Sequence, residues 1–189
     1  MIAIESFKKY HLQDIVAITL LALFWAGLSY LFDATLDPQI SFLVTLITIT
    51  ILMSFTVHLI RKAGAATLFF GLCAIFTISL TEFGVTGFRK FLALVIAGIV
   101  FELAYLILKL ELKNIQLDII LGTGLSAAMI PLVMALQLSF TISVEKFIPL
   151  LNIIIVSFIV GLIGALISFL IWYKVKSLKQ KYPRVYIAR

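Results

Sequence analysis

The chain has 189 residues, of which 63% are hydrophobic and only 13% are charged, against about 25% charged residues in a soluble domain. This composition excludes a soluble globular protein and predicts an integral membrane protein. The net charge of +6 would suit a nucleic-acid-binding protein, but the basic residues lie in the short segments between apolar stretches. We therefore expect no nucleic-acid partner.

Charged residues divide the chain into six apolar stretches, each near the length of about 20 residues that crosses a bilayer as a helix. We predict an all-α integral membrane protein, a compact six-transmembrane-helix bundle that forms one domain over residues 1–189. The predicted helices are 14–32, 39–60, 64–82, 89–109, 116–139 and 146–173, followed by a basic tail over 174–189.

The basic residues also predict the orientation of the bundle. With the N-terminus in the cytoplasm, twelve of them lie on the inner side and only Arg89, Lys90 and Lys146 on the outer side, as the positive-inside rule requires. Both chain ends are then cytoplasmic. The basic tail is expected to contact anionic lipid headgroups, and a role in partner docking stays open.

Small residues recur at four-residue spacing in the predicted first, fifth and sixth helices, a pattern that lets helix backbones approach closely. Within one chain such pairs mostly serve internal packing. Ala22 and Ala26 are the candidates for contact with another membrane protein, because the first helix of a small bundle can be peripheral.

One carboxylate, Glu102, interrupts the apolar run "AGIVFELAYLILK" of the predicted fourth helix. A charge at this depth is costly and usually faces the bundle interior or a cavity. Gly98, Glu102 and Tyr105 share one helical face, so a gap, a carboxylate and an aromatic ring lie together as in a ligand pocket. The alternative is a structural role, in which a protonated Glu102 donates a hydrogen bond to a neighbouring helix.

Three further residues are candidates for solute contact in the outer half. Glu82 precedes the glycine-containing segment "FGVTG", which can fold over an entrance, and Asn152 lies just inside the predicted sixth helix. Trp25 can stack on a flat ring. The alternatives are a helix end in the headgroup region for Glu82, a contact between helices for Asn152 and an interfacial aromatic position for Trp25.

No motif for catalysis or cofactor binding is found in the chain. It has no phosphate-binding glycine loop, no nucleophile elbow and no His and Cys spacing for a metal. Its single cysteine, Cys73, means that the chain has no cysteine pair for metal or redox chemistry. We therefore expect no enzymatic activity, no catalytic residues, no metal and no cofactor.

Four segments resemble the substrate-binding S components of energy-coupling factor (ECF) transporters, in the thiamine and hydroxymethylpyrimidine subfamily. "QDIVAITLLALFWAGLSYLF" (13–32) is similar to the first helix of that subfamily, and "HLIRKAGAA" (58–66) to the turn between its second and third helices. "IAGIVFELAY" (96–105) is similar to its fourth helix, in which Glu102 matches an acid, and "SFIVGLIGALIS" (157–168) to its glycine-bearing sixth helix.

The resemblance implies a subunit that captures a vitamin from outside, while a coupling membrane protein and two ATPase subunits drive its reorientation. Glu82 and Asn152 would then contact the solute and Trp25 would stack on it. Glu102 would form the floor or lock the helix beneath, with Tyr105 as a further binding candidate on the same face. Ala22 and Ala26 would match the small residues that contact the coupling protein. The chain departs from the subfamily in its short "DATLDPQ" loop and in a third helix that begins without an acid.

Two other functions compete with this interpretation. One is a self-contained channel or secondary transporter, which needs a continuous polar path, and the other is a non-transporting scaffold that assembles other membrane proteins. In each case we expect a multi-pass protein of the plasma membrane, surrounded by lipid, in a prokaryotic cell.

Overall fold

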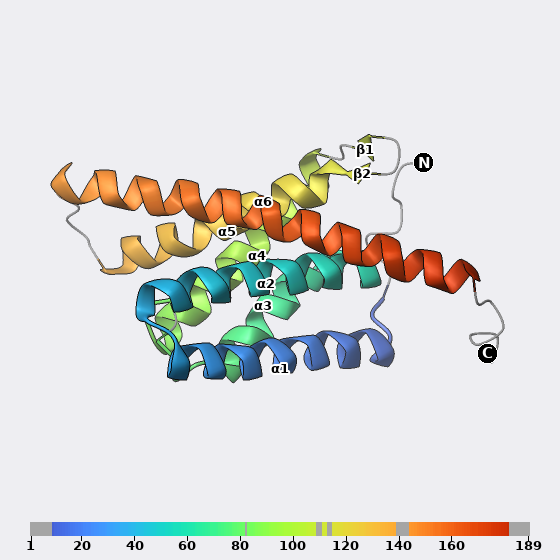
Figure 1. Ribbon diagram of the computed structural model, residues 1–189, viewed down its shortest axis with the longest axis horizontal. Coiled ribbons are helices and arrows are strands. Elements are labelled where there is room, and N and C mark those ends of the chain that lie inside the picture. The colour runs from blue at the N-terminus through green and yellow to red at the C-terminus, as the bar shows by residue number, and fades with distance from the viewer. Residues whose placement is uncertain (1–8, 82, 109–110, 113–114, 139–143, 182–189) are drawn as a thin grey trace.

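The computed structural model describes residues 9–81, 83–108, 111–112, 115–138 and 144–181. Six helices and one short hairpin make up this described part of the chain (Figure 1). The helices are α1 (Leu12–Thr35), α2 (Pro38–Ile60), α3 (Ala65–Phe76), α4 (Phe88–Leu108), α5 (Leu117–Leu138) and α6 (Val144–Lys181). The hairpin pairs β1 (Glu111–Leu112) with β2 (Ile115–Gln116) in antiparallel register.

Five of the six helices, all except α3, are long and apolar enough to cross a membrane. Their lengths follow from uninterrupted runs of Leu, Ile, Val, Phe and Ala, and α2 begins with Pro38 at its first position, where a missing N–H costs nothing. The fold is therefore that of a multi-pass helical membrane protein, because in lipid a helix satisfies its backbone groups internally.

The helices run up and down along one long axis, which defines two ends of the bundle (Figure 1). The terminal end holds the start of α1, the turn at residues 61–64 between α2 and α3, and the hairpin. The distal end holds the turn at residues 36–37 between α1 and α2 and the described part of the loop at residues 77–87. The last turns of α6 point toward the terminal end, on the same side as the start of α1.

The third helix is shorter than the range 64–82 predicted from sequence. It ends at Phe76 after 12 residues, which is about 18 Å of rise. Thr77 is the C-cap residue, with a non-helical backbone conformation. Its amide makes the last i→i−4 bond, to the carbonyl of Cys73 at 3.1 Å, and its hydroxyl donates to the same carbonyl at 2.9 Å. The loop then turns through Gly84 and Gly87, whose φ angles of 77° and 66° suit glycine.

Close helix packing holds α6 against α2 and α5. A Cβ atom on Gly161 would lie 2.7 Å from the Cβ of Ala127 in α5, and one on Gly164 would collide with Thr50 in α2. Both glycines belong to the four-residue spacing seen in the sequence, so here that pattern marks backbones in contact. On the other side of the core, Trp25, Phe69, Phe70 and Phe101 are fully buried.

Candidate functional site

Two ionisable side chains of α4, Glu102 and Lys90, form hydrogen bonds at the two ends of α3. A carboxylate oxygen of Glu102 accepts a hydrogen bond from the amide of Ala66, at 3.0 Å, in the first turn of α3. Lys90, which is fully buried, donates from Nζ to the carbonyls of Thr77 and, at 3.0 Å, Leu80, where α3 has ended. The two residues are twelve positions apart, about 18 Å of rise, which matches the length of the 12-residue helix between them.

This arrangement is electrostatically favourable for α3. A helix carries partial positive charge at its N-terminus and partial negative charge at its C-terminus, so the Glu102 carboxylate and the Lys90 ammonium each meet the opposite sign. The amides of Gly64 and Thr67 also face the Glu102 carboxylate. Glu102 therefore supplies from another helix the acceptor that an N-cap residue normally supplies, and the N-cap residue here, Gly64, has no side chain to do so.

The face of α4 that carries Gly98, Glu102 and Tyr105 contacts protein. A Cβ atom on Gly98 would lie 2.7 Å from the Cα of Thr67, so the backbones of α3 and α4 touch there. Tyr105 stacks on Phe101 with ring centroids 6.1 Å apart. The predicted gap is thus filled by α3. Glu102 bonds to a neighbouring helix, but it accepts the hydrogen bond from the amide of Ala66, whereas its structural interpretation had a protonated Glu102 donating one.

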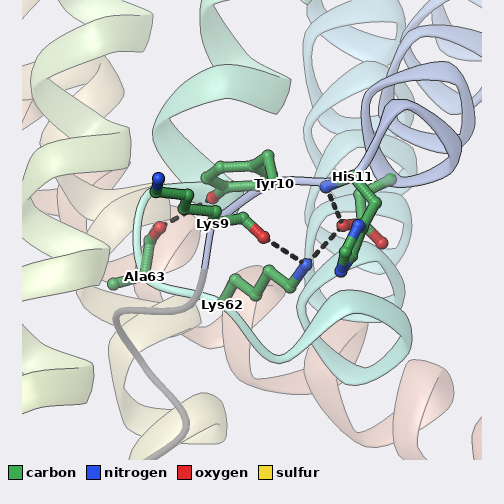
Figure 2. A network of polar contacts seen from close by, with 6 residues as sticks. Lys9, Tyr10, His11, Lys62 and Ala63 are labelled. Carbon is green, nitrogen blue, oxygen red and sulfur yellow. Dashed lines mark hydrogen bonds and ion pairs between the residues drawn. The ribbon is translucent and has the colours of Figure 1, made fainter.

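A polar network closes the terminal end around the turn at residues 61–64 (Figure 2). Lys62 donates to the carboxylate of Asp14 at 2.5 Å and to the carbonyl of Lys9 at 2.9 Å. The same Asp14 oxygen accepts from the amide of His11 at 2.8 Å. This ion pair joins the start of α1 to the turn, and the side chain of Lys62 is only 10% exposed.

Tyr10 connects the chain segment before α1 to the same turn. Its hydroxyl donates to the carbonyl of Ala63 at 2.7 Å (Figure 2). Burial raises the pKa of this hydroxyl to about 12, and the negative charges of Glu102 and Asp14 add to the shift. Because the hydroxyl stays protonated at neutral pH, it remains a hydrogen-bond donor there.

The distal half contains an aromatic cluster, formed by Trp25 of α1, Phe42 of α2 and Phe83 of the loop. Trp25 and Phe83 stack with centroids 6.3 Å apart and an interplanar angle of 13°. Phe42 meets Phe83 edge-on at 5.9 Å. Trp25 is 0% exposed, and its Nε1 donates to the carbonyl of Thr45 at 3.4 Å, which fixes the ring between α1 and α2.

Three buried hydroxyls on α1 and α2 lie at the level of this cluster. Ser29, Ser41 and Thr45 are 0%, 2% and 0% exposed, and none of their side-chain oxygens has a hydrogen-bond partner. Buried polar atoms are nearly always paired. Among the described residues five other buried side-chain atoms also have no partner, on Ser54, His58, Gln137, Ser157 and Ser168. The rest of the loop surrounds a shallow, open depression of about 520 Å³, lined by Thr81, Gly84, Val85, Thr86, Phe88 and Arg89.

The structure separates the other residues predicted for the site. Asn152 is exposed on α6, while Trp25 lies in the aromatic cluster. Glu82 lies outside the described residues. Ala22 and Ala26 are 0% and 5% exposed and pack inside the chain, so their small side chains serve internal contacts in this conformation.

Sequence reasoning missed Lys90, the ion pair of Lys62 with Asp14, and Phe83. Lys90 looked like an outer-side loop charge because it follows Arg89 near a predicted helix start. The sequence held no signal for this role, because the predicted third helix, 64–82, is longer than the twelve-residue α3 that matches the spacing of Lys90 and Glu102. For Phe83 no sequence signal distinguishes it from the fifteen other phenylalanines among the sixteen in the chain.

The fold and these contacts define a multi-pass membrane protein. Hydrogen bonds and an ion pair connect the segments at its terminal end, and its distal half contains the aromatic cluster and three buried hydroxyl groups. Among the described residues, His, Cys, Asp and Glu side chains form no group of three that could hold a metal ion. A scan against protein-family models found no match, and searches of curated proteins and of solved structures found none either.

Proposed function

We propose that this chain is the membrane-embedded, solute-binding subunit of an ECF-type importer. It captures a small water-soluble vitamin or vitamin precursor, thiamine-related in chemistry, from outside the cell. In this proposal the terminal end faces the cytoplasm and the distal end faces outward. A coupling membrane protein and two ATPase subunits are its partners.

The contrast between the two ends of the bundle carries the proposal. The distal half holds a fixed indole, a second aromatic ring and three unpaired buried hydroxyls, the combination of flat apolar walls and a few polar groups that small-molecule sites use. At the terminal end, by contrast, Lys62 forms an ion pair with Asp14, and the hydroxyl of Tyr10 donates a hydrogen bond to the carbonyl of Ala63. In our proposal the solute therefore enters from the distal side.

One-sided access favours a subunit over a self-contained channel. A channel needs a continuous polar path, whereas here fully buried Phe69, Phe70 and Phe101 occupy the core between the distal half and the terminal end. Release on the other side then requires reorientation or rearrangement of the whole bundle, and the energy for that step comes from partner proteins. This is the division of labour that the sequence resemblance implies.

Equilibrium binding of radiolabelled thiamine and hydroxymethylpyrimidine to the purified chain in lipid nanodiscs tests the proposal. We expect saturable binding of at least one of them. The two tryptophans provide matched variants, because Trp25 lies in the distal half and Trp172 stacks on His58 near the terminal end. Trp25→Phe should weaken binding roughly tenfold, about the value of one good aromatic contact, and Trp172→Phe should leave it unchanged.

The proposal is wrong if neither compound binds saturably to folded protein. It is also contradicted if Trp25→Phe and Trp172→Phe have equal effects, because the solute would then not lie in the distal half.

A further inference from the structure

We infer that Arg61, which lies over the ring of Trp172 at the terminal end of the bundle, binds the phosphate group of an anionic phospholipid. The site is formed by α2 and α6 themselves and is distinct from the basic tail at residues 174–189. The inference is independent of the proposed function, because it concerns the outer surface of these two helices and not the interior of the distal half.

The first step is the level of the two residues along the bundle. The membrane-spanning part of α2 ends at Ile60, directly before Arg61. That of α6 covers Pro149–Val175, so Trp172 lies in its last turn. Tryptophan and tyrosine collect where the hydrocarbon meets the headgroups, and Tyr173, the next residue, is 62% exposed. Arg61 and Trp172 therefore lie at the level of the lipid headgroups.

The second step is the way in which Trp172 is held. Its indole stacks on the imidazole of His58, with ring centroids 6.2 Å apart and an interplanar angle of 8°, and it meets the ring of Phe55 edge-on at 6.3 Å. Because His58 is only 3% exposed, contacts inside the bundle fix the indole. The guanidinium carbon of Arg61 lies 6.0 Å from the centroid of this ring, which is the distance of a cation–π contact.

The third step is what this contact leaves available on Arg61. A guanidinium that stacks on a ring keeps its N–H groups at the edge of its plane, where they form the fork that fits a phosphate. Arg61 is exposed, and no carboxylate among the described residues pairs with it. The ring therefore orients the guanidinium, and its edge faces anions from outside the chain.

The fourth step is the backbone of Arg61. This residue is the C-cap of α2, with a φ of 52° and a ψ of 38°, in the left-handed region. Glycine is favoured there, because an L side chain adds strain, and the same turn has glycine at its other left-handed position, Gly64, with a φ of 88°. An arginine in such a position points to a role for its side chain.

The surface beside the guanidinium favours a lipid over a free phosphate ion. Leu59 and Ile171, each next to this cluster in sequence, are 40% and 43% exposed, so acyl chains can cover apolar side chains while the phosphate lies at Arg61. An anionic headgroup is favoured over a zwitterionic one, because it carries no ammonium that competes with the guanidinium and its net charge is attracted by basic residues.

Fluorescence quenching by brominated phospholipids tests the inference. Trp25→Phe leaves Trp172 as the emitter, since the sequence has two tryptophans. This parent variant is placed in nanodiscs that mix phosphatidylglycerol with phosphatidylcholine, one of the two brominated on its acyl chains. We expect phosphatidylglycerol to bind beside Trp172 about fivefold more tightly, the effect of a single basic residue at a membrane surface. Arg61→Gln should remove this preference.

The unaltered chain provides a second measurement if Trp25→Phe does not fold. Trp25 is 0% exposed, so lipid does not reach it and the quenching reports on Trp172. Equal quenching by the two brominated lipids in folded protein would overturn the inference.

Lys174→Gln is the matched control. It removes the same charge from an exposed residue two positions after Trp172, and it should keep most of the preference. Equal losses in Arg61→Gln and Lys174→Gln would overturn the inference, because diffuse charge at the terminal end would then attract the lipid.

Arg61→Gly separates lipid binding from a structural role. Because glycine suits the left-handed backbone, the Tm of this variant in phosphatidylcholine should equal or exceed that of the parent, while the preference for phosphatidylglycerol is lost. A lower Tm with an unchanged preference would overturn the inference, since Arg61 would then serve α2 alone.

Excess inorganic phosphate, added at constant ionic strength, distinguishes the two sources of the anion. An unchanged preference for phosphatidylglycerol supports a lipid site. Loss of the preference would overturn the lipid assignment, because a free phosphate ion would then be the ligand of Arg61.

Discussion

Replacing Glu102 by alanine measures how much α3 depends on α4. The substitution removes the acceptor for the amide of Ala66 and exposes the amides of Gly64 and Thr67 to an apolar surrounding. One buried donor left unpaired costs about 1–3 kcal/mol, and a lost N-cap costs about 1 kcal/mol. We expect a destabilisation of about 3 kcal/mol for Glu102→Ala, and of about 1 kcal/mol for Glu102→Gln, which keeps an acceptor oxygen.

Thermal unfolding in mild detergent, followed by circular dichroism, measures this difference. For a chain of this length 1 kcal/mol shifts Tm by about 2–4 °C, so Glu102→Ala should lower Tm by about 6–12 °C. Leu103→Ala is the matched control, because Leu103 is the next residue on α4 and is 52% exposed. Its Tm should stay near that of the parent.

An equal Tm for Glu102→Ala and Leu103→Ala would refute the reasoning. If Glu102→Ala keeps its Tm and loses only solute binding, Glu102 belongs to the floor of the site and its bond to α3 is incidental.

Three other predictions follow from the same contacts. Gly98→Ala should destabilise the folded chain by about 1–3 kcal/mol, because its Cβ would meet Thr67. The control Gly27→Ala has open space around it and should leave the stability unchanged or raise it by under about 1 kcal/mol. Unfolding curves that show equal effects for the two variants contradict this. Lys90→Met should lower Tm and increase trypsin cleavage at Arg89, because two carbonyls lose their donor; an unchanged digestion rate contradicts it. Tyr10→Phe should remove one tyrosine that ionises near pH 12 from the absorbance titration at 295 nm, since its hydroxyl stays protonated below that pH; loss of one that ionises near 10 contradicts it.

Composition and charge were sufficient to predict the all-helical membrane fold. Five predicted ranges lie within a few residues of α1, α2, α4, α5 and the start of α6, because long apolar runs bounded by charges leave little choice in a bilayer. The end of α3 could not be predicted. The segment 77–87 is more polar than α3, but its Ile78 and Leu80 extended the apolar pattern past Phe76. The sequence does not show that Lys90, a distant residue, bonds to the carbonyls of Thr77 and Leu80 just beyond the helix.

The candidate site was predicted only in part, for a related reason. A carboxylate in an apolar helix must have a partner, so Glu102 could be recognised as important, but its partner is a backbone amide, which has no signature in the sequence. The sequence predicts a stacking role for Trp25, while the ring that stacks on it in the structure, Phe83, comes from a loop. Tertiary contacts of this kind appear only when the chain is folded.

Native mass spectrometry of the tagged chain, extracted from its own membranes in mild detergent, tests the central claim most directly. It records protein partners and retained small molecules together. The importer proposal predicts a complex with a coupling membrane protein and two ATPase subunits, or a bound mass that matches a small heteroaromatic vitamin. A chain that carries only lipid in several detergents would contradict it and favour a membrane scaffold, in which Glu102 and Lys90 serve the fold alone.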